Sequence, residues 1–223
     1  MLFRSLVRWD HPDNGLLSPV EFIAIAEDSG LIVPLGREII DKACQFLKTI
    51  KQIGLPDSFA SLSINISPKQ FSQNDFCKVV NSIIGHYELD PSMIKLEITE
   101  GMLLNDIDGV IKKMGHLKEK SIKFSIDDFG TGYSSLSYLQ KLPLDEIKID
   151  RSFVQEMLNN SRSAAIVETI ATMANKLNFS LIAEGVENEQ QKAFLASHGC
   201  HYYQGYLFDQ PLPGDSLIKK YIN

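Results

Sequence analysis

The chain has 223 residues, of which 44% are hydrophobic, and it carries a formal net charge of −6. This length suits one large α/β domain or two small ones, and the apolar content excludes a disordered chain. The acidic balance argues against a protein that binds duplex nucleic acid, which usually shows a basic face. A small anionic ligand held through metal ions remains compatible with it.

Cysteine and histidine usage points to a reducing compartment without a zinc site. Cys44, Cys77 and Cys200 are far apart and form no Cys-x-x-Cys motif, which predicts reduced thiols. The five histidines show no paired ligand spacing. No apolar run reaches the length of a membrane span, and the N-terminus does not resemble a signal peptide. We therefore expect a cytoplasmic chain, alone or as the cytoplasmic part of a larger membrane protein.

The N-terminal segment predicts one short strand followed by two helices. Residues 5–9 have strand character, and the cluster at residues 11–15 is typical of a turn. Ser18-Pro19-Val20-Glu21 combines a capping box with proline at the first helical position, which predicts a helix to about Gly30. Apolar residues at helical spacing predict a second helix over residues 35–53.

From residue 62 onward, strand and helix patterns alternate. The predicted strands cover residues 62–66, 94–99, 122–127, 145–149, 179–183 and 200–204. The predicted helices cover residues 74–86, 106–119, a stretch from about 133, 163–177 and 189–198, with a short terminal helix after Pro213. This alternation indicates a mainly parallel sheet. The seven candidate strands are one fewer than a closed (β/α)8 barrel contains.

Polar residues recur at the carboxyl ends of six successive predicted strands. They are Asn65, Glu97, Asp127 with Asp128, Lys148, Glu184 and Gln204. In a barrel or an open parallel sheet these ends converge on one face. The acids and the amide are oxygen ligands that suit Mg²⁺ or Mn²⁺. Two such ions about 4 Å apart would activate a water for in-line displacement at phosphorus.

Other interpretations of the same residues stay open at this point. An Asp pair before Gly130-Thr131-Gly132 also suits an ordinary turn, because aspartate and glycine both favour turns. The glycine turn could equally be a loop beside bound metal. Glu97 and Glu184 could form the carboxylate pair of a barrel glycosidase, although Lys148 and the Asp pair would then have no necessary role.

Taken together, the motifs resemble the EAL domain family, the bacterial cyclic di-GMP-specific phosphodiesterases. The strongest matches are residues 127–136 (Asp-Asp-Phe-Gly-Thr-Gly-Tyr-Ser-Ser-Leu), 148–154 (Lys-Ile-Asp-Arg-Ser-Phe-Val), 183–187 (Ala-Glu-Gly-Val-Glu) and 204–206 (Gln-Gly-Tyr). Upstream, Pro19-x-x-Phe22-Ile23, Ala26-Glu27, Asn65-Ile66-Ser67 and Glu97-Ile98-Thr99-Glu100 follow in the same order. The resemblance covers essentially the whole chain.

The resemblance implies a single domain over residues 1–223, folded as a modified TIM-type (β/α)8 barrel that is incomplete at its N-terminus. It also implies two Mg²⁺ or Mn²⁺ ions and hydrolysis of cyclic di-GMP to linear pGpG. A homodimer, and an upstream sensory or GGDEF-type (diguanylate cyclase-like) domain in bacterial signalling, would be in keeping with the family.

The resemblance also assigns roles to individual residues. Asn65, Glu97 and Asp127 would be metal ligands, Asp128 would serve the second metal, and Glu184 would be a ligand or the general base. Lys148 would hold the attacking water or a phosphate oxygen. Arg8 and Gln204 would contact the substrate, Glu100 would anchor the loop that begins at Asp128, and Glu187 would support the site.

One departure from the family pattern bears on activity. The family is named for Glu-Ala-Leu, and here Leu6-Val7-Arg8-Trp9 match while Arg4 and Ser5 stand at the glutamate and alanine positions. That glutamate is a metal ligand in the family, whereas a guanidinium cannot ligate Mg²⁺. Two explanations remain open: a truncated enzyme with weak or no activity, or a degenerate domain that serves as a cyclic di-GMP receptor or interaction module. We expect Arg4→Glu to raise activity if the rest of the barrel is intact.

Overall fold

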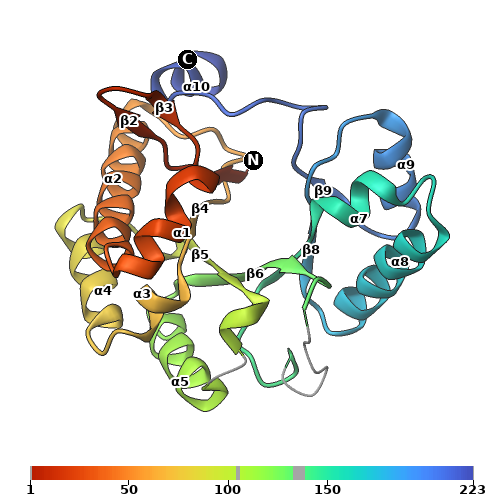
Figure 1. Ribbon diagram of the computed structural model, residues 1–223, viewed down its shortest axis with the longest axis horizontal. Coiled ribbons are helices and arrows are strands. Elements are labelled where there is room, and N and C mark those ends of the chain that lie inside the picture. The colour runs from red at the N-terminus through yellow and green to blue at the C-terminus, as the bar shows by residue number, and fades with distance from the viewer. Residues whose placement is uncertain (1, 104–105, 133–138, 223) are drawn as a thin grey trace. The chain divides into compact units, whose positions relative to one another are not determined.

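A computed structural model describes residues 2–103, 106–132 and 139–222 (Figure 1). The chain divides into two compact units. The first unit comprises residues 1–97, 116–123 and 211–223, and the second comprises residues 98–115 and 124–210. Strand β5 (Ile94–Thr99) and helix α5 (Ile107–Lys118) run across the boundary between these ranges. Each unit is described by itself.

The predicted alternation of strands and helices is confirmed. Within the described residues, the main sheet has seven strands in the order β1-β4-β5-β6-β7-β8-β9. Strands β1, β4 and β5 pair in parallel, as do β6, β7, β8 and β9. The fold is therefore the expected parallel α/β type, with one strand fewer in the described residues than a closed (β/α)8 barrel.

The first unit is built on β1 (Leu2–Arg4), β4 (Ser61–Asn65) and β5. Its helices are α1 (Pro19–Ser29), α2 (Ile32–Ile53), α3 (Pro68–Ser72), α4 (Phe76–His86) and α10 (Gly214–Tyr221), with a short η1 turn (Pro91–Met93). Ile40, Leu47 and Ile50 form the buried stripe of α2. The predicted capping box of α1 is present, since Ser18 and Glu21 cap each other's backbone and Gly30 ends the helix at φ 78°.

The predicted strand over residues 5–9 is wrong. The strand that joins the sheet is β1, three residues earlier, and β2 (Trp9–His11) pairs instead with β3 (Gly15–Leu17) in an antiparallel hairpin. Burial explains the shift, because Phe3 is buried with its ring 5.7 Å from that of Phe59, whereas Leu6 is 42% exposed. An isolated apolar run cannot reveal which of its residues face a core.

The second unit is built on β6 (Lys123–Phe129), β7 (Glu146–Ile149), β8 (Ser180–Ala183) and β9 (Tyr202–Tyr203). Its connections contain η2 (Glu100–Leu103), α7 (Arg151–Glu156), α8 (Ser161–Lys176) and α9 (Glu189–Ser197). Helix α8 begins two residues before its predicted start because the Asn160 side chain accepts hydrogen bonds from the amides of Arg162 and Ser163. The helix predicted from about residue 133 begins outside the described residues.

Two short helices, α3 and α7, were not predicted, because five or six residues are too few to show a helical repeat. Among the described residues, no helix is both long enough and apolar enough to cross a membrane.

Candidate functional site

The Asp127-Asp128 pair lies in the last part of β6, in the second unit. Successive side chains of a regular strand point to opposite faces, so two adjacent aspartates would normally diverge. Here the pairing of β6 with β7 shifts register between Ile126 and Phe129, and Asp128 has a φ of 52°. Aspartate is one of the few non-glycine residues that adopt this left-handed conformation. The irregularity lets both carboxylates reach the same place.

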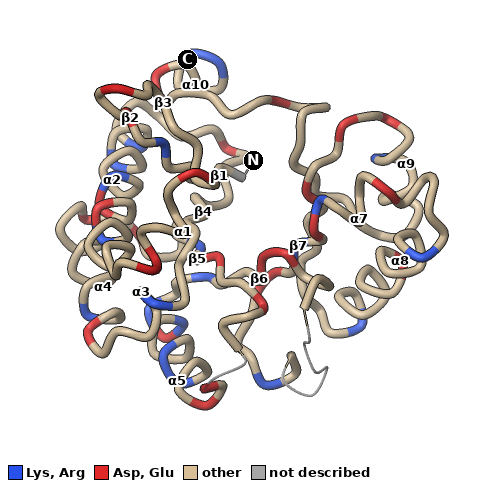
Figure 2. Tube along the Cα trace, in the orientation of Figure 1, with Lys and Arg blue, Asp and Glu red and all other residues tan. Residues whose placement is uncertain are grey.

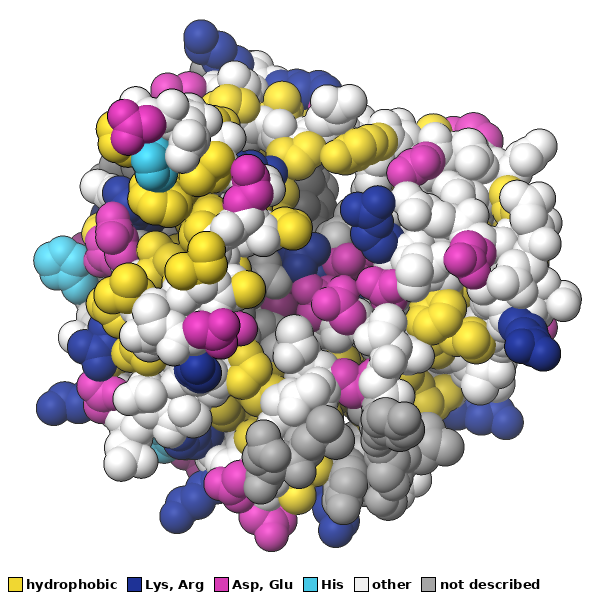
Figure 3. All heavy atoms as spheres, in the orientation of Figure 1, with side chains coloured by type: hydrophobic (Ala, Val, Ile, Leu, Met, Phe, Trp, Pro, Cys, Tyr) yellow, Lys and Arg dark blue, Asp and Glu magenta, His cyan; other side chains and the backbone are white. Residues whose placement is uncertain are grey.

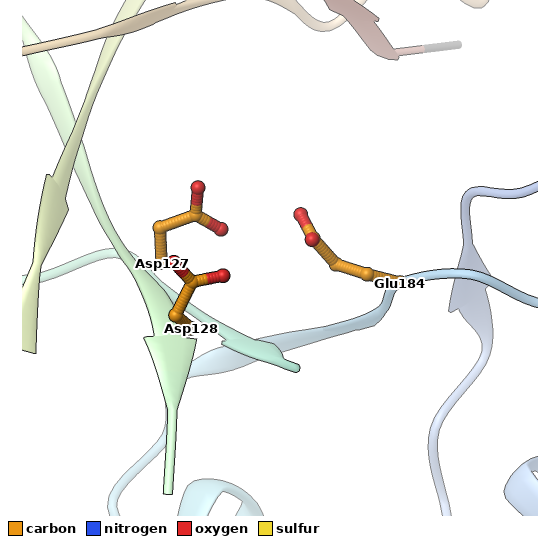
Figure 4. Close-up of side chains that lie close together, drawn as sticks. All are labelled: Asp127, Asp128 and Glu184. Carbon is orange, nitrogen blue, oxygen red and sulfur yellow. The ribbon is translucent and has the colours of Figure 1, made fainter. Parts of the chain in front are cut away.

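Glu184, directly after β8, completes an acidic cluster with this pair. One carboxylate oxygen from each of Asp127, Asp128 and Glu184 lies within 4.8 Å of the others. Figure 4 shows the three side chains pointing toward one another from β6 and from the segment after β8. Figure 2 shows acidic residues (red) along β6 and close to β7. Asp127 and Glu184 are buried, while Asp128 is exposed. The cluster therefore offers three hard oxygen ligands at the carboxyl ends of two strands.

Lys148 and Gln204 hold two members of the cluster in place. The Lys148 side chain is 1% exposed, and its Nζ donates to Asp127 Oδ1 at 2.9 Å and forms an ion pair with Glu184 Oε1. Gln204 Nε2 donates to the same Glu184 oxygen at 2.6 Å. An ammonium between two buried carboxylates offsets the repulsion that they would otherwise exert on each other.

Gly205 permits the approach of Gln204 to Glu184. A Cβ on Gly205 would lie only 2.2 Å from the backbone oxygen of Val186, and φ at this position is 155°. The amide of Val186 donates to the carbonyl of Gln204 at 3.1 Å, so the two segments lie against each other. In the Gln204-Gly205 sequence, Gln204 thus supplies the hydrogen bond to Glu184, and Gly205 provides the space that the close backbone approach needs.

The carboxyl of Asp128 has a raised pKa. Although the residue as a whole is exposed, partial desolvation of its carboxyl, together with the charge of Asp127, raises the pKa of Asp128 to about 6, and the charge and hydrogen bond of Asp150 add to the shift. Asp150 caps α7 by accepting a hydrogen bond from the Ser152 amide at 2.9 Å. We assigned no role to Asp150 from the sequence, although its place directly after β7 is the same signal that identified its neighbours.

Glu100 contacts the turn after β6, the loop that the resemblance expects it to anchor. Its Oε2 accepts hydrogen bonds from the amides of Gly130 at 3.3 Å and Gly132 at 3.1 Å. Glu100 is buried, and Gly130 has a φ of 99°, where a side chain would be strained. Glu187 Oε1 accepts a hydrogen bond from Gln155 Nε2 of α7 at 2.9 Å.

The first unit holds the other predicted residues. Register places Asn65 opposite Glu97 on neighbouring strands, and Arg4 ends β1 beside them. Arg4 Nε lies 2.8 Å from Glu97 Oε2, and Arg4 Nη2 donates to Asn65 Oδ1 at 2.9 Å. Arg8 is exposed, and its Nη1 donates to the carbonyl of Val7 at 2.8 Å.

The two sets of oxygen ligands differ in their fit to a metal. The cluster of Asp127, Asp128 and Glu184 fits a hard divalent cation, because its three carboxylate oxygens converge. Asn65 and Glu97 do not fit one as they stand, because the Arg4 guanidinium binds an oxygen of each. Among the described residues, Asp127, Asp128 and Glu184 are thus arranged so that they could receive an ion, whereas Asn65 and Glu97 are bound by Arg4.

Comparison with known proteins gives the family. The model of the EAL domain matches residues 1–211. The chain belongs to the EAL domain family. The resemblance predicted from residues 127–136 and their companion motifs is confirmed.

Relatives of this EAL domain include two proteins of Pseudomonas aeruginosa. It is 39% identical over 214 residues to the bifunctional diguanylate cyclase/cyclic di-GMP phosphodiesterase MucR, an alignment that covers 96% of the chain and 31% of MucR. It is 40% identical over 209 residues to the cyclic di-GMP phosphodiesterase NbdA, covering 94% of the chain and 26% of NbdA. The chain thus spans a third or less of these two relatives.

Solved structures give the same fold. A structure of the PaMucR phosphodiesterase in complex with c-di-GMP matches with a TM-score of 0.92 and 39% identity, over 96% of this chain and 86% of that one. The EAL enzyme Bd1971, in its form with cAMP and cyclic di-GMP bound, matches with a TM-score of 0.92 and 36% identity, over 97% of this chain and 59% of that one. These matches confirm the expected TIM-type fold.

Proposed function

We propose that this EAL domain hydrolyses one phosphodiester bond of cyclic di-GMP to give linear pGpG, with Mg²⁺ or Mn²⁺ as cofactor. The observation that carries the proposal is the convergence of Asp127, Asp128 and Glu184 around the Lys148 ammonium in the second unit. The names of MucR and NbdA, and the c-di-GMP bound in the PaMucR structure, supply the substrate.

The reaction adds one water across one P–O bond. The water oxygen attacks phosphorus, the bond to the ribose oxygen breaks, and that oxygen leaves with a proton while the water gives one up. A bound divalent ion would acidify the water and offset charge on the phosphate. In this scheme Glu184 takes the proton or holds the ion, and Gln204 orients its carboxylate. Lys148 holds the water or a phosphate oxygen, and the exposed Arg8 contacts phosphate.

We further propose that the rate is low in this chain. Asn65 and Glu97 serve as ligands in the scheme that the family resemblance implies, but Arg4 binds both of them. The test is an incubation of the purified chain with cyclic di-GMP and Mn²⁺, beside a sample in EDTA. We expect slow formation of pGpG that depends on metal. No pGpG at high enzyme concentration would reject the enzymatic proposal for this chain.

A receptor for cyclic di-GMP is the second candidate, and the Arg4 contacts favour it. A domain whose Asn65 and Glu97 oxygens are bound by a guanidinium could still hold the ligand through Arg8 and Gln204. Calorimetry with cyclic di-GMP and Ca²⁺, which we expect to allow binding without efficient chemistry, separates the candidates. Heat without product with either ion would support the receptor, and neither heat nor product would reject both.

Assembly and location are also proposals. We propose a homodimer, because β1 and β9 each pair with one described neighbour and edge strands invite pairing. Large apolar side chains are also exposed on the first unit, over β3 and α1, among them Leu16, Val20 and Ile25 (Figure 3). A monomer by light scattering would reject the proposed homodimer.

We also propose that the domain functions in the bacterial cytoplasm, beside a sensory or GGDEF-type domain. Fractionation of cells, followed by detection of the native protein in each fraction, would test this location.

A further inference from the structure

Arg4 ends β1 at the point where the neighbouring strands present Asn65 and Glu97. These three strands are consecutive in the sheet, with Arg4 opposite Ser63 and Asn65 opposite Glu97. One guanidinium therefore reaches an amide oxygen at 2.9 Å and a carboxylate oxygen at 2.8 Å. Arg4, Asn65 and Glu97 all belong to the first unit.

This arrangement has the charge pattern of a cation site that is already filled. A carboxylate oxygen and an amide oxygen directed at one positive centre are two of the oxygen ligands that a hard divalent ion takes, with water able to supply others. A guanidinium carries only donors, and in proteins it stays protonated. The Glu97 side chain is 2% exposed and that of Arg4 is 23% exposed, so water screens the pair poorly.

We propose that Arg4 is a built-in cation that takes the place of a metal ion at Asn65 and Glu97. This chain would then bind divalent metal at Asp127, Asp128 and Glu184 while its first unit takes up none. The inference rests on the proposed function in one respect: it treats the Asn65 and Glu97 oxygens as ligands. It adds that one residue, Arg4, decides how many ions the domain holds.

Replacement of Arg4 should convert the filled site into an open one. Arg4→Glu would place a further carboxylate beside Asn65 and the buried Glu97 and would remove the charge that offsets Glu97. Two close carboxylates repel each other unless a cation lies with them. The variant should therefore be less stable than the wild type in EDTA, and Mn²⁺ should restore its stability.

The test counts ions rather than turnover. Mn²⁺ is titrated into the metal-free wild type, Arg4→Glu and Arg4→Gln, with bound ion measured by calorimetry and free ion by electron paramagnetic resonance. Arg162→Glu, which reverses an exposed arginine of α8, is the matched control for net charge. We expect Arg4→Glu to bind one more ion than the wild type and to gain more in melting temperature on addition of Mn²⁺. Arg162→Glu should match the wild type on both counts.

Arg4→Gln and one double variant keep the result unambiguous. Arg4→Gln removes the charge without adding repulsion, so it should stay folded and show an additional, weaker Mn²⁺ site. Combining Arg4→Glu with Glu184→Gln should weaken the ion of the second unit but retain the new one. Equal ion counts for the wild type and both Arg4 variants would overturn the inference. The same counts would stand even if the chain formed no pGpG, so failure of the catalytic proposal is distinguishable.

Discussion

At the scale of single residues, the backbone at Asp128 decides whether the acidic cluster exists. Its φ of 52° and the adjacent register shift turn two consecutive side chains toward Glu184. Aspartate and asparagine tolerate this conformation, whereas a β-branched residue is strained in it. The choice of residue here is therefore constrained by conformation as well as by charge.

We predict that Asp128→Val loses more stability than Asp128→Asn in metal-free buffer. The left-handed conformation should cost valine about 1–2 kcal/mol, while asparagine should fold almost as well as the wild type. Urea denaturation gives both free energies of unfolding. Lys123→Val, in the same strand but at a residue whose φ is not positive, is the control and should cost little. Equal losses for Asp128→Val and Asp128→Asn would contradict the conformational argument.

Lys148 gives a second prediction at this scale. Lys148→Met would leave Asp127 and Glu184 buried without the ammonium that binds both. Breaking a buried ion pair from one side costs about 3–5 kcal/mol, so the variant should unfold at much lower urea in EDTA. Lys192→Met removes an exposed partner of Glu189 and should cost about 0–1 kcal/mol. Similar midpoints for the two variants would show that the Lys148 contacts contribute little to stability.

At the scale of elements, the turn after β6 is fixed by a residue about thirty positions earlier. Glu100, in η2, accepts hydrogen bonds from the amides of Gly130 and Gly132. A carboxylate that accepts from backbone amides makes a charge-assisted hydrogen bond, which is stronger than a neutral one. This turn directly follows Asp128. An ordered turn should therefore help to hold the Asp128 carboxylate in the acidic cluster.

We predict that Glu100→Gln loosens this turn without unfolding the domain. The amides of Gly130 and Gly132 should exchange hydrogen faster, because a neutral oxygen accepts more weakly than a carboxylate. Hydrogen exchange read by mass spectrometry measures it on a peptide spanning β6 and the turn. Glu187→Gln, whose carboxylate accepts from Gln155, is the control and should leave that peptide unchanged. Unchanged exchange in Glu100→Gln would contradict the anchoring role.

The strands also show which features of the fold and of the candidate site can be predicted from the sequence. It was predictable that Asn65, Glu97, Asp127 and Glu184 lie in the last part of a parallel strand or directly after it, because alternating apolar residues and a polar residue mark that region. The register shift at Asp128 was not, since it depends on pairing with β7. The contacts of Arg4 with Asn65 and Glu97 were not predictable either, because no local sequence pattern gives the register of β1 against its neighbouring strands.

At the scale of the whole molecule, the core protects two of the three thiols. Burial raises the pKa of Cys44 and of Cys200 to about 12, whereas Cys77 in α4 is only half-buried. The thiolate is the reactive form, and at pH 8 a thiol with a pKa of about 12 is about 0.01% ionised.

We predict that a disulfide reagent at pH 8 labels Cys77 in the folded chain and reaches Cys44 and Cys200 only after unfolding. A higher pH should speed labelling of Cys44 and Cys200 only when it approaches their pKa, or when it unfolds the chain. Absorbance of the released reagent gives the rates, and mass spectrometry of peptides gives the sites. Equally fast labelling of all three thiols at pH 8 would contradict the described burial.

We propose that the acidic cluster of this EAL domain supports hydrolysis of cyclic di-GMP and that Arg4 lowers its rate. The most direct measurement is the initial rate of pGpG formation from cyclic di-GMP with Mn²⁺, for the wild type, Arg4→Glu and Glu184→Gln. We predict slow, metal-dependent hydrolysis by the wild type, a rate at least tenfold higher for Arg4→Glu, which is about 1.4 kcal/mol of the barrier, and none for Glu184→Gln. A folded Arg4→Glu variant that is no faster than the wild type, or a Glu184→Gln variant that is equally active, would contradict the claim.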